Sequence, residues 1–248
     1  MILNTVPLFF CVRTDWMSYA VLLLLVAWTD HGPWNSWNRV PYITEDRHGP
    51  GRPSIIPKDV HIYENFMLAN YNAICAIDTD DGSSYIKVYD NVLAYASAGL
   101  KSDFGGHAET YSGNLLAYVG DCIMDGMNTD RSPGHGLGFG DQFVNNTCVY
   151  RNNLTGYQSD CFTSLQQPPT GRGWEVHGNR VYSQTGSTTV CLCPPSTGQH
   201  SMPCNASMPL QQWVALGHDR GSTSRKWPID EELVAWGKQL LKLSQHYT

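Results

Sequence analysis

Charged residues are scarce in this sequence: Asp, Glu, Lys and Arg occupy 15% of its 248 positions, against about 25% in typical soluble domains. Helical bundles need Lys- and Glu-rich surfaces, so the shortage favours β structure whose surface carries Asn, Ser, Thr and Tyr. The net charge of -6 provides no basic patch. Nucleic acid is therefore disfavoured as a partner.

The apolar run at residues 19–28, YAVLLLLVAW, is too short to cross a membrane, because a spanning helix needs about 20 residues. It fits a buried strand and the core of a signal peptide equally well. Arg13 and Asp15 precede it only weakly, and TDHGPW is a poor cleavage region. We therefore treat residues 1–30 as a separate N-terminal segment, either signal-like or a truncated start.

The sequence has no Cys-x-x-Cys pair among its eight cysteines, which argues against zinc. Cys191, Cys193 and Cys204 crowd a Pro- and Ser-rich stretch with few core residues, where a disulfide is the favoured interpretation. Three N-x-S/T sequons begin at Asn145, Asn153 and Asn205. Together these features predict an oxidising, extracellular or cell-surface setting, with disulfide connectivity left open.

An internal repeat runs through the middle of the chain. Segments such as VYDNVLAYAS and TYSGNLLAYVG share an asparagine followed by short apolar residues and usually a tyrosine, and the recurring positions are Asn65, Asn91, Asn114, Asn146 and Asn179. Their spacings of 26, 23, 32 and 33 residues are typical of a solenoid. Alternating Val-, Tyr- and Ile-rich segments make each unit several short strands. Stacked units of this kind form a parallel β-helix, with the asparagines bonded in a ladder along one turn.

The phrases DHGPWNSW, IDTDDGSSY, GLKSDFGGH and GNLLAYVG resemble rungs of the right-handed parallel β-helix superfamily that contains pectate lyases and polygalacturonases. The resemblance covers about residues 30–220. It implies an all-β, right-handed parallel β-helix solenoid over 31–220 and an activity on carbohydrate.

A helix is predicted after the repeats, at residues 227–243 (WPIDEELVAWGKQLLKL). Acidic residues begin it, lysines end it, and Leu233, Trp236, Leu240 and Leu243 share one face. We expect this amphipathic C-terminal α-helix to pack on or beside the solenoid.

The repeat also places the acidic stretch AIDTDDGSS in register with the next coil. A period of 23 residues aligns Ile77 with Leu100 and Ile123 as an aliphatic ladder. Because strand side chains alternate, the opposite face then carries Asp78 over Lys101 and Asp80 over Asp103, and Ser84 stacks on His107.

Two carboxylates on adjacent strands repel, so one holds a proton or a cation lies between them. Either arrangement is useful chemically. The favoured function is glycoside hydrolysis by paired carboxylates, with the following catalytic candidates: Asp80, Asp103, Asp81, His107 and Lys101. No cofactor is required for it. The alternative is that this stretch has no catalytic role. It would then be an ordinary acidic turn, in which Asp78 pairs with Lys101 on a solvated face.

Other candidates are substrate-binding residues: Asp78, Tyr85, Arg39, Trp37 and His135. Trp37 and Tyr85 suit stacking on sugar rings, and Arg39 suits a carboxylate. His135 lies in a Gly-His-Gly like that of polygalacturonases, but Asn128-Thr129-Asp130 follows the Asp80-Asp81 doublet and no convincing Arg-x-Lys comes later. This departure from the family pattern counts against polygalacturonase activity, and a stretch such as SPGHGLGFG is more often a flexible loop than a site.

Two further functions stay open. One is a calcium-assisted polysaccharide lyase or C5-epimerase, with Ca²⁺ held by Asp78, Asp80 and Asp103 and with Lys101 as base. The other is a non-catalytic β-helix that binds carbohydrate or acts as a surface scaffold. In each case the expected partner is a polysaccharide or oligosaccharide, with no nucleic acid and no obligate protein partner.

Overall fold

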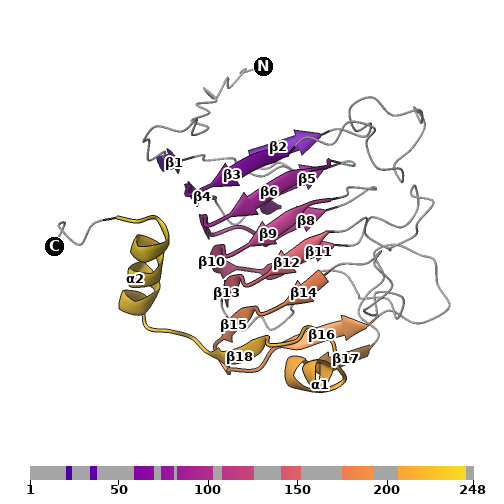
Figure 1. Ribbon diagram of the computed structural model, residues 1–248. Helices are drawn as coiled ribbons and strands as arrows, with labels where there is room; N and C mark the ends of the chain where they lie inside the picture. Colours follow the sequence, from indigo (N-terminus) through magenta and orange to yellow (C-terminus); the bar gives the residue numbers. More distant parts are fainter. Residues whose placement is uncertain are drawn as a thin grey trace, which may run out of the picture.

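The computed structural model describes residues 21–23, 34–37, 59–69, 74–80, 83–102, 108–125, 141–151, 175–192 and 206–243. About half of them form strands in three parallel sheets (Figure 1). The five-stranded sheet contains β3 (Val60–Tyr63), β6 (Ile86–Tyr89), β9 (Thr110–Ser112), β12 (Gln142–Val144) and β14 (Glu175–His177). The four-stranded sheet contains β2 (Trp34–Trp37), β5 (Cys75–Asp80), β8 (Ala98–Ser102) and β11 (Asp121–Asp125). The seven-stranded sheet contains β1 (Val21–Leu23), β4 (Phe66–Leu68), β7 (Val92–Ala94), β10 (Leu115–Val119), β13 (Thr147–Tyr150), β15 (Arg180–Ser183) and β18 (Thr223–Lys226).

The chain visits the three sheets in a fixed order. We call a coil three consecutive strands with one from each sheet, and such coils are β3–β4–β5, β6–β7–β8 and β9–β10–β11. Equivalent strands of successive coils pair in parallel. The predicted parallel β structure is therefore confirmed, and the order is compatible with a β-helix-like solenoid.

The register confirms the 23-residue period. Ile77 pairs with Leu100 in β5 and β8, and Leu100 pairs with Ile123 in β8 and β11. All three side chains are buried in the interior, as the predicted aliphatic ladder requires. Asp78 pairs with Lys101, also as predicted.

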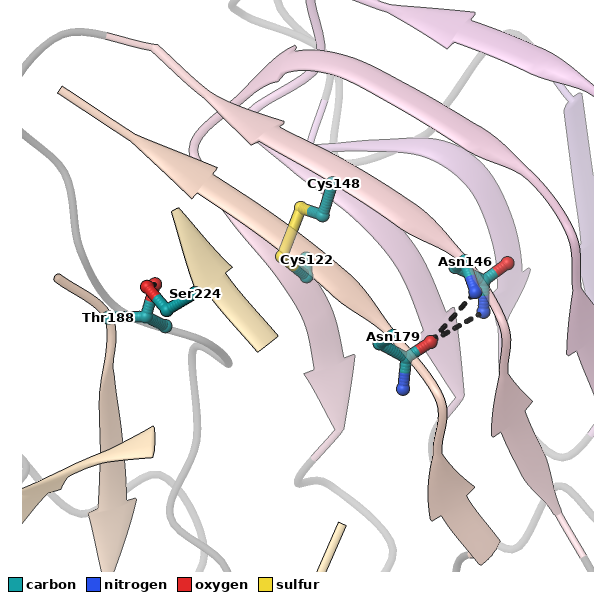
Figure 2. The surroundings of a disulfide bond; sticks show 6 residues. All are labelled: Cys122, Asn146, Cys148, Asn179, Thr188 and Ser224. Carbon is teal, nitrogen blue, oxygen red and sulfur yellow. Dashed lines mark hydrogen bonds between the residues drawn. A yellow bond between two sulfur atoms is a disulfide. The ribbon is translucent and has the colours of Figure 1, made fainter. Parts of the chain in front are cut away.

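The predicted asparagine ladder is present at the corner between the five-stranded and seven-stranded sheets. Each ladder side chain accepts a hydrogen bond from the backbone N–H of the ladder residue one coil earlier, as from Asn91 to Asn114 Oδ1 at 3.1 Å and from Asn114 to Asn146 Oδ1 at 3.0 Å. Figure 2 shows the step from Asn146 to Asn179. The ladder ends at Ser222, whose Oγ accepts from the Asn179 N–H at 2.7 Å. This corner therefore satisfies its buried polar groups without water.

A left-handed backbone conformation precedes every ladder position. The residues that adopt this positive φ are Glu64, Asp90, Gly113, Asn145, Gly178 and Gly221. Gly178 is additionally fixed by space, because a Cβ there would lie 2.3 Å from Asn145 Oδ1. The sharp bend at each corner thus depends on glycine, or on a residue that tolerates this conformation.

A disulfide crosses the interior between successive coils. Cys122 of β11 is bonded to Cys148 of β13, with their Cα atoms 5.9 Å apart (Figure 2). Both residues belong to the buried core. Cys191 also takes part in a disulfide, as expected for its stretch, while Cys193 and Cys204 lie outside the described residues.

The chain departs from the parallel pattern near its end, inside the range predicted as solenoid. Strands β16 (Thr189–Leu192) and β17 (Ala206–Pro209) pair antiparallel, and helix α1 (Leu210–Ala215) follows them. Helix α2 (Asp230–Leu240) lies within the predicted 227–243 but starts later. The reason is that the Trp227 N–H donates to the Ser183 carbonyl at 3.0 Å, which continues the sheet before the helix begins.

Strand β1 of the apolar N-terminal run is part of the seven-stranded sheet, and helix α2 lies against that sheet. The apolar run contains a strand, β1, that pairs with β4. Helix α2 packs through Leu233 and Leu241 on the outer face of the seven-stranded sheet, beside which it stands in Figure 1. Within the described residues, no helix is both long enough and apolar enough to span a membrane.

Candidate active site

The candidate site lies on the outer face of the four-stranded sheet, where β5 passes beside β8. Ile77 and Thr79 point into the interior, where Thr79 meets the hydroxyl of Tyr111. Because strand side chains alternate, Asp78 and Asp80 point to the opposite face. The predicted orientation of these two acids is therefore confirmed.

Lys101 lies between the two carboxylates. Its Nζ is 2.6 Å from Asp80 Oδ1 and 3.0 Å from Asp78 Oδ1. Asn35 of β2 donates from Nδ2 to Asp78 Oδ2 at 3.0 Å. We call Asp78, Asp80, Lys101 and Asn35 the acid–lysine cluster. Lys101 thus provides a positive charge to both acids of β5.

Burial makes the acid–lysine cluster different from a surface ion pair. Asp78 is fully buried, whereas the Asp80 side chain keeps 15% of its surface exposed. Burial raises the pKa of Asp78 above its ordinary value, although the Lys101 charge opposes the shift and the nearby Asp80 charge adds to it. Asp78 is therefore suited to holding Lys101 in place, and Asp80 is the acid that a ligand can reach.

Ser83 connects the end of β5 to the neighbouring strand β2. Its hydroxyl donates to the Asp80 carbonyl at 2.8 Å or to the Ser36 carbonyl at 3.1 Å, and it also contacts the Ser36 hydroxyl. Since Ser36 belongs to β2, these contacts link the backbone of Asp80 to the neighbouring coil.

A second acidic group lies beneath this sheet, inside the molecule. Glu109 and Asp141, which we call the interior acid pair, are both fully buried, and the Glu109 N–H donates to Asp141 Oδ1 at 2.9 Å. The Tyr111 hydroxyl lies 2.9 Å from Glu109 Oε2 and 2.7 Å from the Lys101 carbonyl. Thr79 also donates to this carbonyl. The interior acid pair thus supports the backbone of Lys101 from below.

Asp141 of the interior acid pair holds its proton more firmly than an exposed aspartate does. Burial raises the pKa of Asp141 from 3.8 to about 7, against the lowering effects of the Glu109 N–H and the Lys87 charge. Burial and the Glu109 charge raise the pKa of Tyr111 well above its ordinary value. Both shifts favour neutral side chains, as expected for ionisable groups away from water.

The structure brings together part of the predicted site. Asp78, Asp80 and Lys101 are in contact, and the backbone of Trp37 pairs with Asp80 in β2 and β5. Tyr85 is half-buried just before β6, with a positive φ of 59°. The remaining predicted site residues lie outside the described residues: Asp81, Asp103, His107, Arg39 and His135.

Sequence reasoning missed Asn35 and the interior acid pair. Asp141 follows Glu109 by 32 residues, which is also the spacing from Asn114 to Asn146, so the repeat aligns the two acids. Asn35 lies in the DHGPWNSW segment, before the first asparagine of the repeat at Asn65, so no repeat spacing aligned it with Asp78. No group of three or more metal-binding side chains occurs among the residues that the structure describes.

None of the protein-family models, curated proteins or solved structures with which the chain was compared matches it.

Proposed function

We propose that this protein is a right-handed parallel β-helix that hydrolyses a polysaccharide on the outer face of its four-stranded sheet. The observation that carries the proposal is the acid–lysine cluster, in which one lysine holds two carboxylates from the adjacent strand. Three parallel sheets and the asparagine ladder support the fold, and a parallel crossover is right-handed in almost all known sheets. They also support the resemblance to the pectate lyase and polygalacturonase superfamily.

The roles follow from the distances. Asp80 is the acid of the cluster that keeps exposed surface, and Lys101 Nζ holds its Oδ1 at 2.6 Å, so we assign Asp80 the role of nucleophile or general base. The general acid is then a second carboxyl group, for which the register predicts Asp103, with Asp81 and His107 as neighbours. Retaining glycosidases place the two groups about 5–5.5 Å apart and inverting enzymes about 6.5–9.5 Å apart. Asp78 is a positioning residue that acts through Lys101.

An extracellular or cell-surface setting belongs to the same proposal. The Cys122–Cys148 disulfide fits an oxidising compartment. Asn145, the first residue of a sequon, is exposed at the corner between β12 and β13. Both features suit a protein that meets polysaccharide outside the cell.

The test is a screen of acidic and neutral polysaccharides that measures new reducing ends. We expect the Asp80→Asn variant to lose activity by about 10² or more, because it removes the carboxyl group to which the chemistry is assigned. Asp59→Asn is the matched control, since Asp59 is exposed near β3 and its carboxylate is 3.9 Å from Lys87. Full activity of Asp80→Asn, with correct folding by circular dichroism, would refute the hydrolytic role.

The same screen separates the lyase alternative. A lyase releases an unsaturated product that absorbs in the ultraviolet, and a calcium-dependent one stops working when a chelator is added. The geometry favours hydrolysis, because an ammonium group held by two carboxylates has no lone pair with which to take a C5 proton. Calcium-dependent ultraviolet absorbance would assign Lys101 and the acids to the lyase chemistry instead.

A further inference from the structure

The outer face of the seven-stranded sheet contains a hollow beneath α2 that the proposed hydrolytic site does not use. Its volume is about 410 Å³, within the range of about 300–1,000 Å³ of small-molecule sites. Val92, Ala94, Leu115 and Ala117 form the floor, and the Leu233 side of α2 forms the wall. The lining is therefore almost entirely apolar.

The hollow has a clear cause in the sequence. One row of outward-facing residues crosses the sheet, and it consists of Leu68, Ala94, Ala117, Val149 and Tyr182 in successive strands. The two alanines in the middle leave space where the other strands carry larger side chains. Packing in a protein interior is normally close, so an unfilled hollow of this size is a feature to explain.

Helix α2 is held against the sheet at its second half and just beyond its C-terminal end. Trp236 packs on Tyr182 with ring centroids 5.3 Å apart, and Lys242 forms an ion pair with Glu64. Between these supports the helix approaches the sheet at Gly237, where a Cβ would be 3.7 Å from Val92. These contacts attach α2 to the sheet on which the hollow lies.

Its mouth combines exposed apolar groups with one unpaired charge. Tyr95, Val234 and Leu243 line it and expose 37%, 55% and 38% of their surface. Among the described residues that line it, Glu64 and Lys238 carry the charges. Glu64 is paired with Lys242, whereas Lys238 makes no ion pair within the part of the chain that the structure describes. An apolar ligand with an anionic end complements this arrangement.

We propose that the hollow binds a free medium-chain fatty acid, with the acyl chain on the alanine floor and the carboxylate beside Lys238. The apolar walls remove the chain from water, at about 0.8 kcal/mol for each buried CH₂ group. The exposed ammonium of Lys238 adds a smaller contribution, which requires the charged carboxylate of the fatty acid. This site is separate from the acid–lysine cluster and does not depend on hydrolytic activity.

The test measures binding of dodecanoate, and of dodecanol as the uncharged match, to the full chain by calorimetry below their aggregation concentrations. Ala94→Leu places in β7 the side chain that Leu68 already provides in β4, so we expect the variant to fold. Because the added side chain fills the hollow, the variant should melt at a higher temperature and lose dodecanoate binding. Ala117→Leu repeats the test in the next strand. Ala235→Leu, on an exposed position of α2, is the control and should bind normally.

Lys238→Gln tests the head group. We expect dodecanoate affinity to fall about twofold to fivefold, the size of an exposed ion pair, and dodecanol affinity to stay unchanged. Lys226→Gln, an exposed lysine of β18, should change neither. The proposal is overturned if dodecanoate does not bind, if folded Ala94→Leu and Ala117→Leu bind it as well as the natural chain, or if Lys238→Gln leaves its affinity unchanged.

Discussion

The outer faces of the four-stranded and seven-stranded sheets share one repeat but have opposite characters. The first carries the acid–lysine cluster, in which buried charges satisfy one another. The second is apolar, covered by α2, and incompletely filled above Ala94 and Ala117. The ladder and the inward residues fix the coil, so the outward residues are free to differ from sheet to sheet. Function is therefore expected to differ between the two faces.

The largest loss of stability is expected when Lys101 is removed from the acid–lysine cluster. Lys101→Met leaves Asp78 and Asp80 without their cation, and removing one partner of a buried ion pair costs about 3–5 kcal/mol. Lys242→Met is the match at the apolar face, where the lysine side chain is 70% exposed, and should cost less than about 1 kcal/mol. Denaturant titration measures both. Equal losses would mean that the acid–lysine cluster behaves like a surface pair.

The disulfide comes next, because it connects strands of the two sheets that carry these faces. Cys122 and Cys148 are 26 residues apart, and closing a loop of that length contributes about 3.5 kcal/mol in the chain-entropy model. We expect Cys122→Ala with Cys148→Ala to lower the free energy of unfolding by about that amount. Reductant should then destabilise the natural chain more than the double variant. An unchanged midpoint in the double variant would contradict this role.

A smaller loss is expected at the apolar face. Leu233→Ala removes a buried side chain from beneath α2, and Leu to Ala changes in cores cost about 2–5 kcal/mol. We expect the lower end, because the neighbouring hollow already limits the contacts. Val234→Ala, next in the helix and 55% exposed, should change stability by less than about 0.5 kcal/mol. Similar losses in the two variants would show that α2 is not held through Leu233.

The smallest expected effect is a change in the pH dependence of stability, about 1 kcal/mol over one pH unit. We assign it to the interior acid pair, which lies beneath the charged face. The pKa of Asp141 is about 7 in the folded chain and 3.8 without its surroundings, so the folded state binds the extra proton between these values. Stability therefore falls as pH rises through this window, by about 1 kcal/mol from about pH 6 to about pH 7. Asp141→Asn should flatten the slope, whereas Asp59→Asn should not. An unchanged slope in Asp141→Asn would place the titration elsewhere.

The sequence was sufficient for the parts of the fold that repeat. Asn91, Asn114 and Asn146 recur because each corner needs the same buried side chain, so their spacing predicts the ladder and, through it, the pairing of Asp78 with Lys101. The 23-residue period was readable for the same reason. A structural requirement that recurs in every coil therefore produces a residue that recurs in the sequence.

Features that join distant segments could not be predicted in this way. Asn35 reaches Asp78 across 43 positions from a segment that lacks the spaced asparagine of the repeat, so neither the contact nor the full burial of Asp78 could be predicted. The hollow needs α2, which lies far along the chain from Ala94. The interior acid pair was aligned by spacing, but its burial depends on packing around Tyr111 that no local pattern reports.

The central claim is that the charged face carries the hydrolytic function, and one paired measurement tests it most directly. Reducing-end release should be compared for the natural chain, Asp80→Asn and Ala94→Leu on the same panel of polysaccharides. We predict a loss of about 10² or more in Asp80→Asn and unchanged hydrolysis in Ala94→Leu. Normal hydrolysis by folded Asp80→Asn, or a loss confined to Ala94→Leu, would contradict the claim.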